Sequence, residues 1–358
     1  MKTAVARDGK KRIAVIHNID FLSRPATAGP DEPLTFEADA EVAQTAAKIA
    51  EILRAQGHEV TILQASDSLD HLPAELRRLS IEVVFNLVET LASDASREAE
   101  LPLLLEALQI PYTGNGPRAL HLAHAKDETK KLLAAQGIPT PQGLAIHRIG
   151  DLSPALVAGL RFPLFVKPAR TDGSIGIDQD SIVRDFSALH RRVAWLLEHL
   201  PAPALVEEYL PGKEINVAVF PDPFAGHVVP TEIVFDCFPA GHEPIVTYDC
   251  KWLPESPEFA AYSRPCRDDL PAELREEILR IARTTFLALG GTSYGRVDMR
   301  LNEQGRPAVI DVNPNNDLDP EAGLAVAARS AGVEYPDLIA QILAGASLKG
   351  THENPTHS

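Results

Sequence analysis

Basic charge, cysteine and long apolar runs are all scarce in this sequence. Its 358 residues hold 34 Lys and Arg against 50 Asp and Glu, so the formal net charge is -16. Nucleic acids and anionic membranes attract basic surfaces, and we therefore expect neither as a partner. No apolar run is long enough to cross a bilayer. The apolar residues 13–16, which follow a basic N-terminus, are too few for the core of a signal peptide.

The few cysteines argue against a structural zinc site and favour a reducing compartment. Cys237, Cys250 and Cys266 have no CxxC spacing and no histidine cluster in register with them. A small, odd number of thiols is typical of a chain that folds without disulfides. We therefore expect a cytoplasmic protein.

The length exceeds that of one compact unit and favours two or three domains that share an interface. Up to about residue 117, short β-branched runs alternate with amphipathic segments, which predicts an open α/β sheet. Strands are predicted at 162–167, 204–209 and 214–220, and a loop of small residues spans Thr171–Gly176. The irregular, proline-rich stretch 221–268 suggests a loop that covers a substrate.

The stretch 294–313 predicts a β-hairpin with acidic residues on one face. Polar and apolar residues alternate on both sides of the turn signal at 302–305. In a hairpin that is symmetric about this turn, Asp298 lies opposite Asp311, and Asn313 shares their face. Two opposed carboxylates repel unless a cation lies between them. Their oxygen atoms, with the Asn313 amide, suit a magnesium ion that carries nucleotide phosphates.

Two arginines on the same face leave open whether this hairpin binds a ligand or is a solvated surface. Arg296 can meet an anionic substrate or the charge that develops in a transition state. Alternatively, Arg296 and Arg300 simply neutralise the acids of a solvated hairpin. The spacing of the residues does not separate these two interpretations.

Five motifs in a fixed order resemble the D-alanine–D-alanine ligase group of ATP-grasp enzymes, from Arg12 to about Ala344. They are Lys167-Pro168, the loop Thr171–Gly176, Glu207-Glu208-Tyr209-Leu210 with Glu214, Gly295-Arg296-Val297-Asp298, and Asp311-Val312-Asn313-Pro314-Asn315. The resemblance implies an α/β protein with an ATP-grasp fold after an N-terminal open parallel α/β (pre-ATP-grasp) domain. The expected division is a flexible N-terminus (1–11), the N-terminal α/β domain (12–117), a central ATP-grasp subdomain (118–212), a C-terminal subdomain with the metal site (213–346) and a disordered tail (347–358).

The same resemblance implies an ATP-dependent carboxylate–amine ligase, with ATP and Mg²⁺ or Mn²⁺ as cofactors. Such an enzyme phosphorylates a small carboxylic acid, and an amine then attacks the acylphosphate and releases phosphate beside the ADP already formed. We expect small-molecule substrates, such as an amino acid or related metabolite, and a homodimer. Alternatives are a true D-alanine–D-alanine ligase of cell-wall synthesis, a non-catalytic ATP-binding module and a small-molecule kinase. A P-loop enzyme is disfavoured, because the sequence lacks GxxxxGK[ST].

The resemblance also assigns roles to individual residues. Those expected to contact the phosphates are Lys126, Lys167, Gly173, Ser174 and Lys251. Those expected to hold adenine and ribose are Glu207, Glu208, Tyr209, Leu210 and Glu214. Magnesium would be held by Asp298, Asp311 and Asn313, and catalysis would involve Arg296, Ser174 and Lys251.

The departures from the family fall where the amino-acid substrates would bind. Gly173-Ser174 stands where the family has two serines, and Trp252 stands where it has a tyrosine. An ungapped alignment places Ala322 at the serine that meets the second substrate's carboxylate, and Asp317 at a glycine. The acid that would hold the first substrate's amine is open among Glu37, Asp39 and Glu41. We therefore expect a substrate pair other than two D-alanines.

Overall fold

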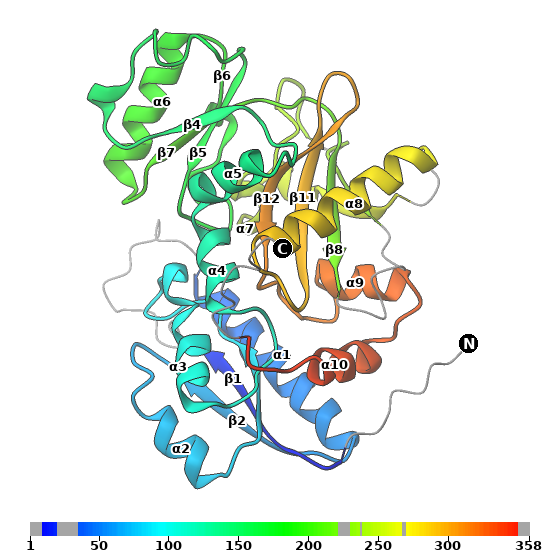
Figure 1. The fold of residues 1–358 in the computed structure, drawn as a ribbon. Coiled ribbons are helices and arrows are strands. Elements are labelled where there is room, and N and C mark those ends of the chain that lie inside the picture. The colour runs from blue at the N-terminus through cyan, green and yellow to red at the C-terminus, as the bar shows by residue number, and fades with distance from the viewer. Residues whose placement is uncertain (1–8, 20–34, 221–229, 237, 267–269, 350–358) are drawn as a thin grey trace, which may run out of the picture.

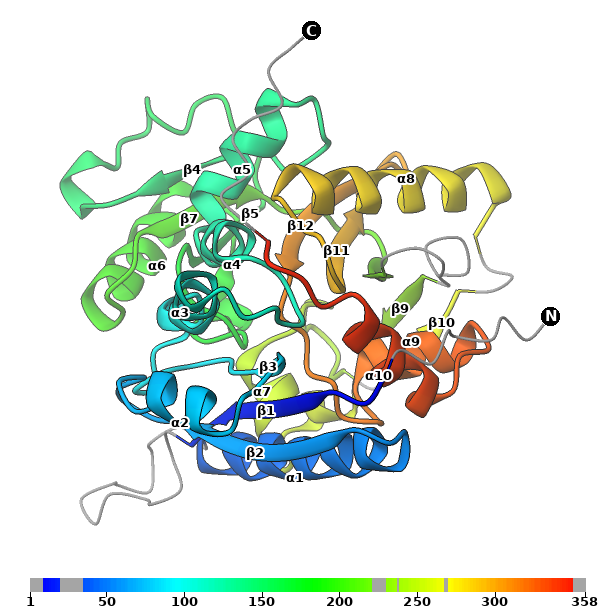
Figure 2. The same cartoon turned by 60° about the horizontal axis from the view of Figure 1, so that its bottom comes forward.

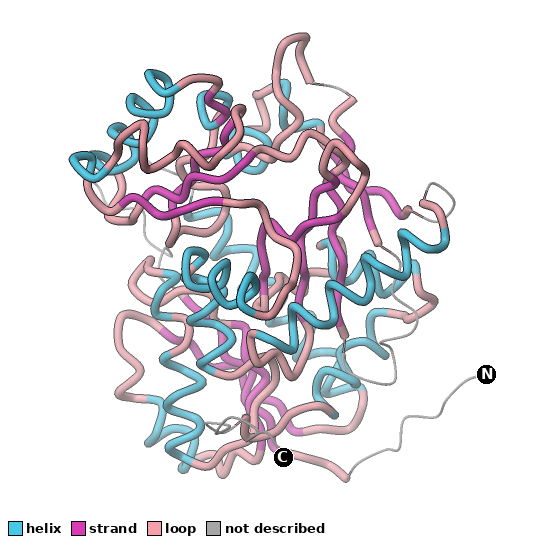
Figure 3. The backbone as a smooth tube through the Cα atoms, turned by 45° about the horizontal axis from the view of Figure 1, so that its top comes forward, coloured by secondary structure: helices cyan, strands magenta, loops and turns pink. Residues whose placement is uncertain are grey.

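The computed structural model describes residues 9–19, 35–220, 230–236, 238–266 and 270–349. The described residues form three sheets that helices surround (Figure 3). An N-terminal domain lies below two further sheets in Figure 1, and the last helices of the chain return to it. The expected α/β fold is confirmed. Residues 1–8 and 350–358, parts of the expected flexible termini, lie outside the described residues.

The N-terminal domain is a parallel sheet in the order β2-β1-β3. Apolar residues at helical spacing place α1 on one face of this sheet, with Ile49 and Leu53 against Val15 and Phe85. Helices α2 and α3 cover the other face (Figure 2). The bounds are β1 Arg12–Asn18, α1 Thr35–Ala55, β2 Glu59–Ala65, α2 Leu72–Arg78, β3 Val83–Leu87 and α3 Glu100–Leu108.

The central subdomain is an antiparallel sheet in the order β4-β7-β5-β6, with α6 packed against it. Two short helices, α4 and α5, lead from the N-terminal domain into this sheet (Figure 1). The bounds are α4 Pro117–His124, α5 Lys126–Ala135, β4 Gly143–Ile146, β5 Leu164–Pro168, β6 Ile182–Val183, α6 Phe186–His199 and β7 Ala204–Glu208.

The C-terminal subdomain is an antiparallel sheet in the order β10-β9-β8-β11-β12. Helix α8 covers one face, where Ile278 and Phe286 pack on Val297 and Met299. The alternate residues of β11 therefore point to the opposite face, toward the central subdomain. The bounds are β8 Glu214–Val219, β9 Thr231–Val234, α7 Tyr248–Trp252, β10 Tyr262–Pro265, α8 Ala272–Ala288, β11 Gly295–Leu301, β12 Pro307–Asn313, α9 Gly323–Ser330 and α10 Tyr335–Ala344.

One buried asparagine ties the N-terminal domain to the β11–β12 hairpin. The Asn115 amide nitrogen donates to the backbone oxygens of Tyr294 and Pro314, each at 2.7 Å. Its carbonyl oxygen accepts from the backbone nitrogens of Thr292 (2.8 Å) and Ser293 (3.0 Å). All four hydrogen-bonding positions of the side chain are used. The ends of β11 and β12 are thus held against the N-terminal domain.

Several elements differ from the expectations. A 3₁₀ turn, Ala95–Arg97, precedes α3 within the stretch expected only to alternate between strands and helices. The stretch expected to be irregular contains β9, α7 and β10. The expected disordered tail is wrong at its start, because Ser347 pairs with Tyr112 and the Lys349 backbone donates to Glu106. No described helix is long and apolar enough to span a membrane.

Candidate active site

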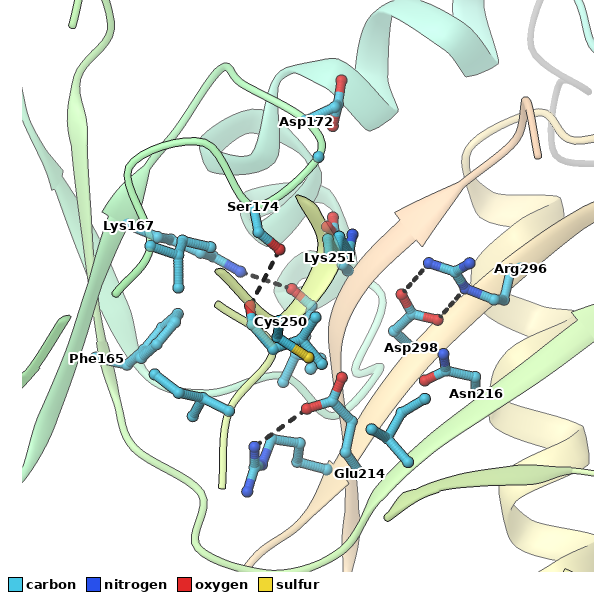
Figure 4. A pocket seen from close by; sticks show the side chains of 18 of the residues that line it. Phe165, Lys167, Asp172, Ser174, Glu214, Asn216, Cys250, Lys251, Arg296 and Asp298 are labelled. Atoms are coloured by element: carbon cyan, nitrogen blue, oxygen red, sulfur yellow. Dashed lines mark hydrogen bonds and ion pairs between the residues drawn. The ribbon is translucent and has the colours of Figure 1, made fainter. Parts of the chain in front are cut away.

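A cavity of about 370 Å³ lies between the central and C-terminal sheets (Figure 4). One wall comes from β5, β7 and the loop that follows β5, and carries Lys167 and Ser174. The opposite wall is the face of β8, β11 and β12 turned away from α8. Helix α7 brings Lys251 to the cavity, and α9 contributes Leu324 at one end. All the predicted site residues line this cavity except Asn313.

Three oxygen-bearing side chains stand in a row across the sheet. Asn216 of β8 pairs with Asp298 of β11, and Asp298 pairs with Asp311 of β12. The predicted opposition of the two carboxylates is therefore confirmed, with a register shift just after Asp298. Asn313 pairs with Arg296 one step further along the same face.

Cationic groups balance both carboxylates. The Arg296 guanidinium donates to both oxygens of Asp298, at 2.6 and 2.8 Å. The Lys126 ammonium lies 3.8 Å from Asp311. The expected alternative of a solvated hairpin face does not hold, because Asp298 and Arg300 are 7% and 4% exposed. These acids and arginines instead form the floor of the cavity.

This row of oxygen atoms fits a hard divalent cation. Asp298 and Asp311 supply carboxylates, and Asn313 supplies an amide oxygen that accepts from the Asn315 backbone at 2.9 Å. The amide oxygen of Asn216 is buried and accepts no hydrogen bond from the described residues. The described residues contain no cluster of three His, Cys, Asp or Glu that could hold a metal, so any magnesium here would rely on amide and phosphate oxygens as well.

Lys126 joins the small-residue loop to the acidic strand. Its ammonium donates to the Thr171 carbonyl and to the Asp172 carboxylate, both at 2.8 Å. Burial opposes this charge, but Asp311 and Asp172 outweigh burial and raise the pKa of Lys126. Burial also opposes the charge on Asp172, but Lys126 and His124 outweigh burial and lower the pKa of Asp172. A fixed positive charge thus lies beside the predicted phosphate loop.

Glu207 lies between two lysines at the other end of the cavity. Its carboxylate is 2.7 Å from the Lys130 ammonium and 3.4 Å from that of Lys167, and Lys167 also donates to the Ile310 carbonyl at 3.0 Å. Burial opposes the charge on Glu207, yet the two ammonium groups outweigh it and lower its pKa. Burial lowers the pKa of Lys130 to about 8.

Glu208, which we expect to contact the nucleotide, has its carboxylate paired with Arg161. The Arg161 guanidinium donates to it at 2.8 Å, and the Arg161 backbone nitrogen at 3.0 Å. This pairing follows from the strand, since neighbouring residues point to opposite sides. Glu208 can meet a ligand in the cavity through its backbone, as Leu210 can.

Glu214 is paired with an arginine whose role the sequence did not reveal. Arg300 donates to Glu214 at 3.1 Å, to the Pro244 carbonyl at 2.7 Å and to the Gly212 carbonyl at 3.0 Å. Burial raises the pKa of Glu214. Arg300 thereby links the predicted ribose-binding acid to the turn after β7 and to the loop before α7. Two further residues were missed as site candidates: Lys130, which pairs with Glu207, and Asn216, which lines the cavity. Asn216 is two positions from Glu214 and so shares its side of β8.

The loop after β5 is hydrogen-bonded to the segment around α7. The Trp252 indole donates to the Gly173 carbonyl at 2.8 Å, and the Ser174 hydroxyl donates to the Val246 carbonyl at 3.0 Å. Gly173 and Ser174 have positive φ angles of 65° and 61°. Trp252, which lacks the phenolic hydroxyl expected at its position, therefore supplies a different donor to the loop. Lys251 lines the cavity, where partial removal from bulk water and then the nearby Arg296 charge lower the pKa of its ammonium group.

We predict that Trp252→Phe loosens this loop without unfolding the protein. The change keeps a ring against Gly173 but removes one hydrogen bond, which should lower kcat/KM for ATP roughly three- to tenfold. Initial rates of ADP release measure this effect. Trp195→Phe is the matched control, because that tryptophan is 39% exposed on α6. Equal rates for both variants and the unchanged protein would show that the indole donor does not position the loop.

The end of the cavity near Arg296 lacks the hydroxyl expected of the family. Ala322 is the N-cap of α9 and makes no side-chain cap hydrogen bond. Asp317 is exposed on the preceding turn, and its carboxylate accepts from the Asp319 backbone at 2.8 Å. The apolar side chains of Leu324 and Ala327 line the cavity there. The candidates Glu37, Asp39 and Glu41 belong to α1, but their side chains are outside the described part of the chain.

The two sheets with a charged cavity between them are those of an ATP-grasp enzyme, as the comparisons with known proteins also indicate. The profile of the family described as "D-ala D-ala ligase C-terminus" matches residues 132–344. A D-alanine–D-alanine ligase of Gloeobacter violaceus is 31% identical over 298 residues, 81% of this chain and 89% of that protein. A Sinorhizobium fredii protein, "Uncharacterized protein y4sG", is 30% identical over 93% of this chain and 96% of its own length.

The fold agrees with these sequence relationships. The crystal structure of a D-alanine–D-alanine ligase from Bacillus anthracis, complexed with ATP, superposes with a TM-score of 0.70. It is 23% identical and covers 94% of this chain and 97% of that one. The chain belongs to the D-alanine–D-alanine ligase family. It is an ATP-dependent ligase that forms a carbon–nitrogen bond, with ATP and Mg²⁺ as cofactors.

Proposed function

We propose that this ligase joins the carboxylate of an amino acid or related metabolite to an amine, and that two D-alanines are not its preferred substrates. The observation that carries the proposal is the turn before α9. Ala322 offers no hydroxyl there, and Asp317 adds a negative charge. A carboxylate on the second substrate would lie in a poorly hydrated cavity, where an uncompensated anion is costly.

The cavity divides into a nucleotide part and a reaction part. In the proposal, Glu207, Glu214 and the backbone of 208–210 hold adenine and ribose. The phosphates lie among Lys126, Lys167, Lys251 and the loop at Gly173 and Ser174. Asp298, Asp311 and Asn313 hold magnesium, with Asn216 as an added oxygen donor. Support comes from the position of all these residues except Asn313 around one cavity, and from the two cations beside the acids.

Each of these groups has a defined task in the reaction. The carboxylate oxygen of the substrate takes the γ-phosphoryl group and ADP leaves; the amine then attacks the acyl carbon, phosphate leaves and the amine gives up a proton. Bound Mg²⁺ neutralises charge on the transferred group. Lys126 holds the phosphate loop and adds positive charge at its base. Arg296 stabilises the oxyanion of the acyl carbon, and the loop around Trp252 excludes water that would hydrolyse the acylphosphate.

We predict that D-alanine is a poor second substrate. The test is kcat/KM for ADP release over amino acids of both chiralities and simple amines, with products identified by mass. We expect the kcat/KM of at least one amine without a free carboxylate near its nitrogen to exceed that of D-alanine by tenfold or more. A factor of this size is about the effect of one well-placed polar group. If D-alanyl-D-alanine forms more efficiently than every alternative, the activity named for the relatives applies here and this proposal is wrong.

The remaining expectations are also proposals. We infer that the protein is a cytoplasmic homodimer with few cysteines. We infer no nucleic-acid partner, because the net charge is -16. We propose domain boundaries at residues 117 and 212, where the three sheets are separated along the chain. Sedimentation in solution would measure the assembly directly.

A further inference from the structure

An ion pair lies on the floor of the cavity, at the proposed nucleotide part. Glu214 of β8 and Arg300 of β11 pair directly across the sheet, and the guanidinium donates to one carboxylate oxygen at 3.1 Å. Both side chains line the cavity, although they are only 8% and 4% exposed. The second carboxylate oxygen of Glu214 is turned toward the middle of the cavity (Figure 4). One oxygen is thus held by the protein, and the other can accept from a ligand.

More than this ion pair fixes the Arg300 guanidinium. It donates to the Gly212 carbonyl at 3.0 Å and to the Pro244 carbonyl at 2.7 Å, and its central carbon lies 5.3 Å from the centre of the Tyr209 ring. The Gly212 backbone nitrogen donates in turn to the Leu301 carbonyl at 2.9 Å. A planar guanidinium with several donors keeps one orientation when it bonds in several directions at once. It is therefore a rigid support for the carboxylate beside it.

The strand geometry places this pair along the length of the cavity. The next cross-strand pair is Asn216 with Asp298, at the proposed metal site. Side chains two residues apart on a strand lie about 7 Å apart. On the side away from the metal, the guanidinium contacts the segment 209–212, which follows the proposed adenine site. The ribose of a nucleotide must lie between its base and its phosphates, which is where the carboxylate of Glu214 stands.

Glu214 depends on its partner to act in this place. A buried carboxylate without a cation is costly, so the side chain would turn away toward water if the guanidinium were removed. A carboxylate that has turned away no longer accepts charge-assisted hydrogen bonds from hydroxyls at a fixed position. The orientation of this acid is therefore set by Arg300.

We propose that Arg300 is a positioning residue, which orients Glu214 toward the ribose hydroxyls and so sets the preference of this ligase for a ribonucleotide. The inference rests on the proposed placement of ribose beside Glu214, and it names the residue on which that recognition depends. Arg300 contacts the carboxylate and not the sugar. The several directed donors of the guanidinium, rather than its charge alone, hold the carboxylate in place.

The test compares the affinities for ATP and for 2′,3′-dideoxy-ATP, measured by titration calorimetry with Mg²⁺ and without the acid and amine substrates. The wild-type protein should bind ATP about tenfold or more tightly, because only ATP has sugar hydroxyls that donate to the carboxylate. Arg300→Met and Arg300→Lys should each reduce this ratio at least about threefold. The lysine variant keeps a cation beside the buried carboxylate, so we expect it to fold even if the methionine variant does not.

The preference for ATP over GTP separates positioning from general damage to the cavity. That preference is assigned to Glu207 on the opposite wall, so it should stay unchanged in both Arg300 variants. Arg306→Met is the matched control, because Arg306 is an exposed arginine in the turn of the same hairpin, and it should keep both preferences. The proposal is overturned if Arg300→Lys folds and keeps the wild-type sugar preference, or if it loses the sugar and base preferences equally.

A Glu214→Ala variant separates this proposal from the nucleotide placement on which it rests. If its ratio stays at the wild-type value, ribose does not lie beside Glu214, and the placement is wrong together with the role of Arg300. If Glu214→Ala lowers the ratio and the Arg300 variants do not, only the role of Arg300 is refuted. Because Arg300 acts through Glu214, adding Arg300→Met to Glu214→Ala should lower the ratio no further. A further loss in the combined variant overturns the proposal, since Arg300 would then act on the nucleotide independently.

Discussion

An Asp311→Asn protein is expected to lose roughly 10²–10³-fold in ATP turnover and to remain folded. Asp311 and Asp298 oppose each other on the floor of the main cavity, and oxygen ligands with full charge hold Mg²⁺ far better than a neutral amide. A metal that neutralises the transferred phosphoryl group is worth several kcal/mol in such reactions, which gives the expected factor. Asparagine has nearly the same shape, so packing is preserved.

The measurement is ADP release at saturating substrate over a range of Mg²⁺ concentrations, with thermal unfolding as the check on folding. Glu303→Gln is the matched control, because Glu303 is an exposed acid in the turn of the same hairpin. It makes the same change of charge away from the cavity and should leave turnover unchanged. Near-normal turnover in a folded Asp311→Asn protein would rule out the metal assignment.

Replacing Glu207 with alanine should have the largest effect on stability, and should also weaken ATP binding tenfold or more. The carboxylate is 2% exposed and lies between the Lys130 and Lys167 ammonium groups. Removing one partner of a buried ion pair leaves uncompensated charge and typically costs about 3–5 kcal/mol. Urea unfolding measures this loss. Titration calorimetry with ATP and GTP measures the loss of affinity and of discrimination between the two nucleotides.

A second variant separates the two effects. Glu207→Leu combined with Lys130→Met removes the carboxylate together with one of the ammonium groups it pairs with. The free energy of unfolding should therefore recover much of the loss seen in Glu207→Ala. Discrimination between ATP and GTP should stay weak, because no carboxylate is present to accept from the adenine amino group. Unchanged ATP affinity in either variant would refute the adenine assignment of Glu207.

The register of the acidic hairpin could be predicted because it depends on local signals. A clear turn at 302–305 and strict alternation on both sides determine which residues face each other. The partners of the same residues could not be predicted in this way. Lys126 reaches Asp311 from α5. Arg300 of β11 pairs with Glu214 of β8, and the pairing of these two strands depends on the whole sheet. Such contacts follow from packing between distant segments.

Substitutions away from a family pattern were the hardest to interpret from sequence. The change to Trp252 indicated only that a phenolic hydroxyl was missing. In the structure its indole donates to Gly173, a residue that itself departs from the family pattern. Ala322 and Asp317 likewise indicated a rewritten pocket, but the sequence did not show that Tyr294 and residues of the N-terminal domain lie beside Asp317. A one-dimensional comparison cannot reveal neighbours of this kind.

The saturated side chain of Asn115 has a consequence for how this protein can change in evolution and in the laboratory. Its side chain forms hydrogen bonds with four main-chain groups that flank β11 and β12, as a backbone segment would. Chimaeras that graft the first domain of one relative onto the catalytic half of another must therefore match this asparagine with the two main-chain acceptors and two main-chain donors that it bonds. Modular exchange at this junction is constrained by one amide, although the two parts look separable along the chain.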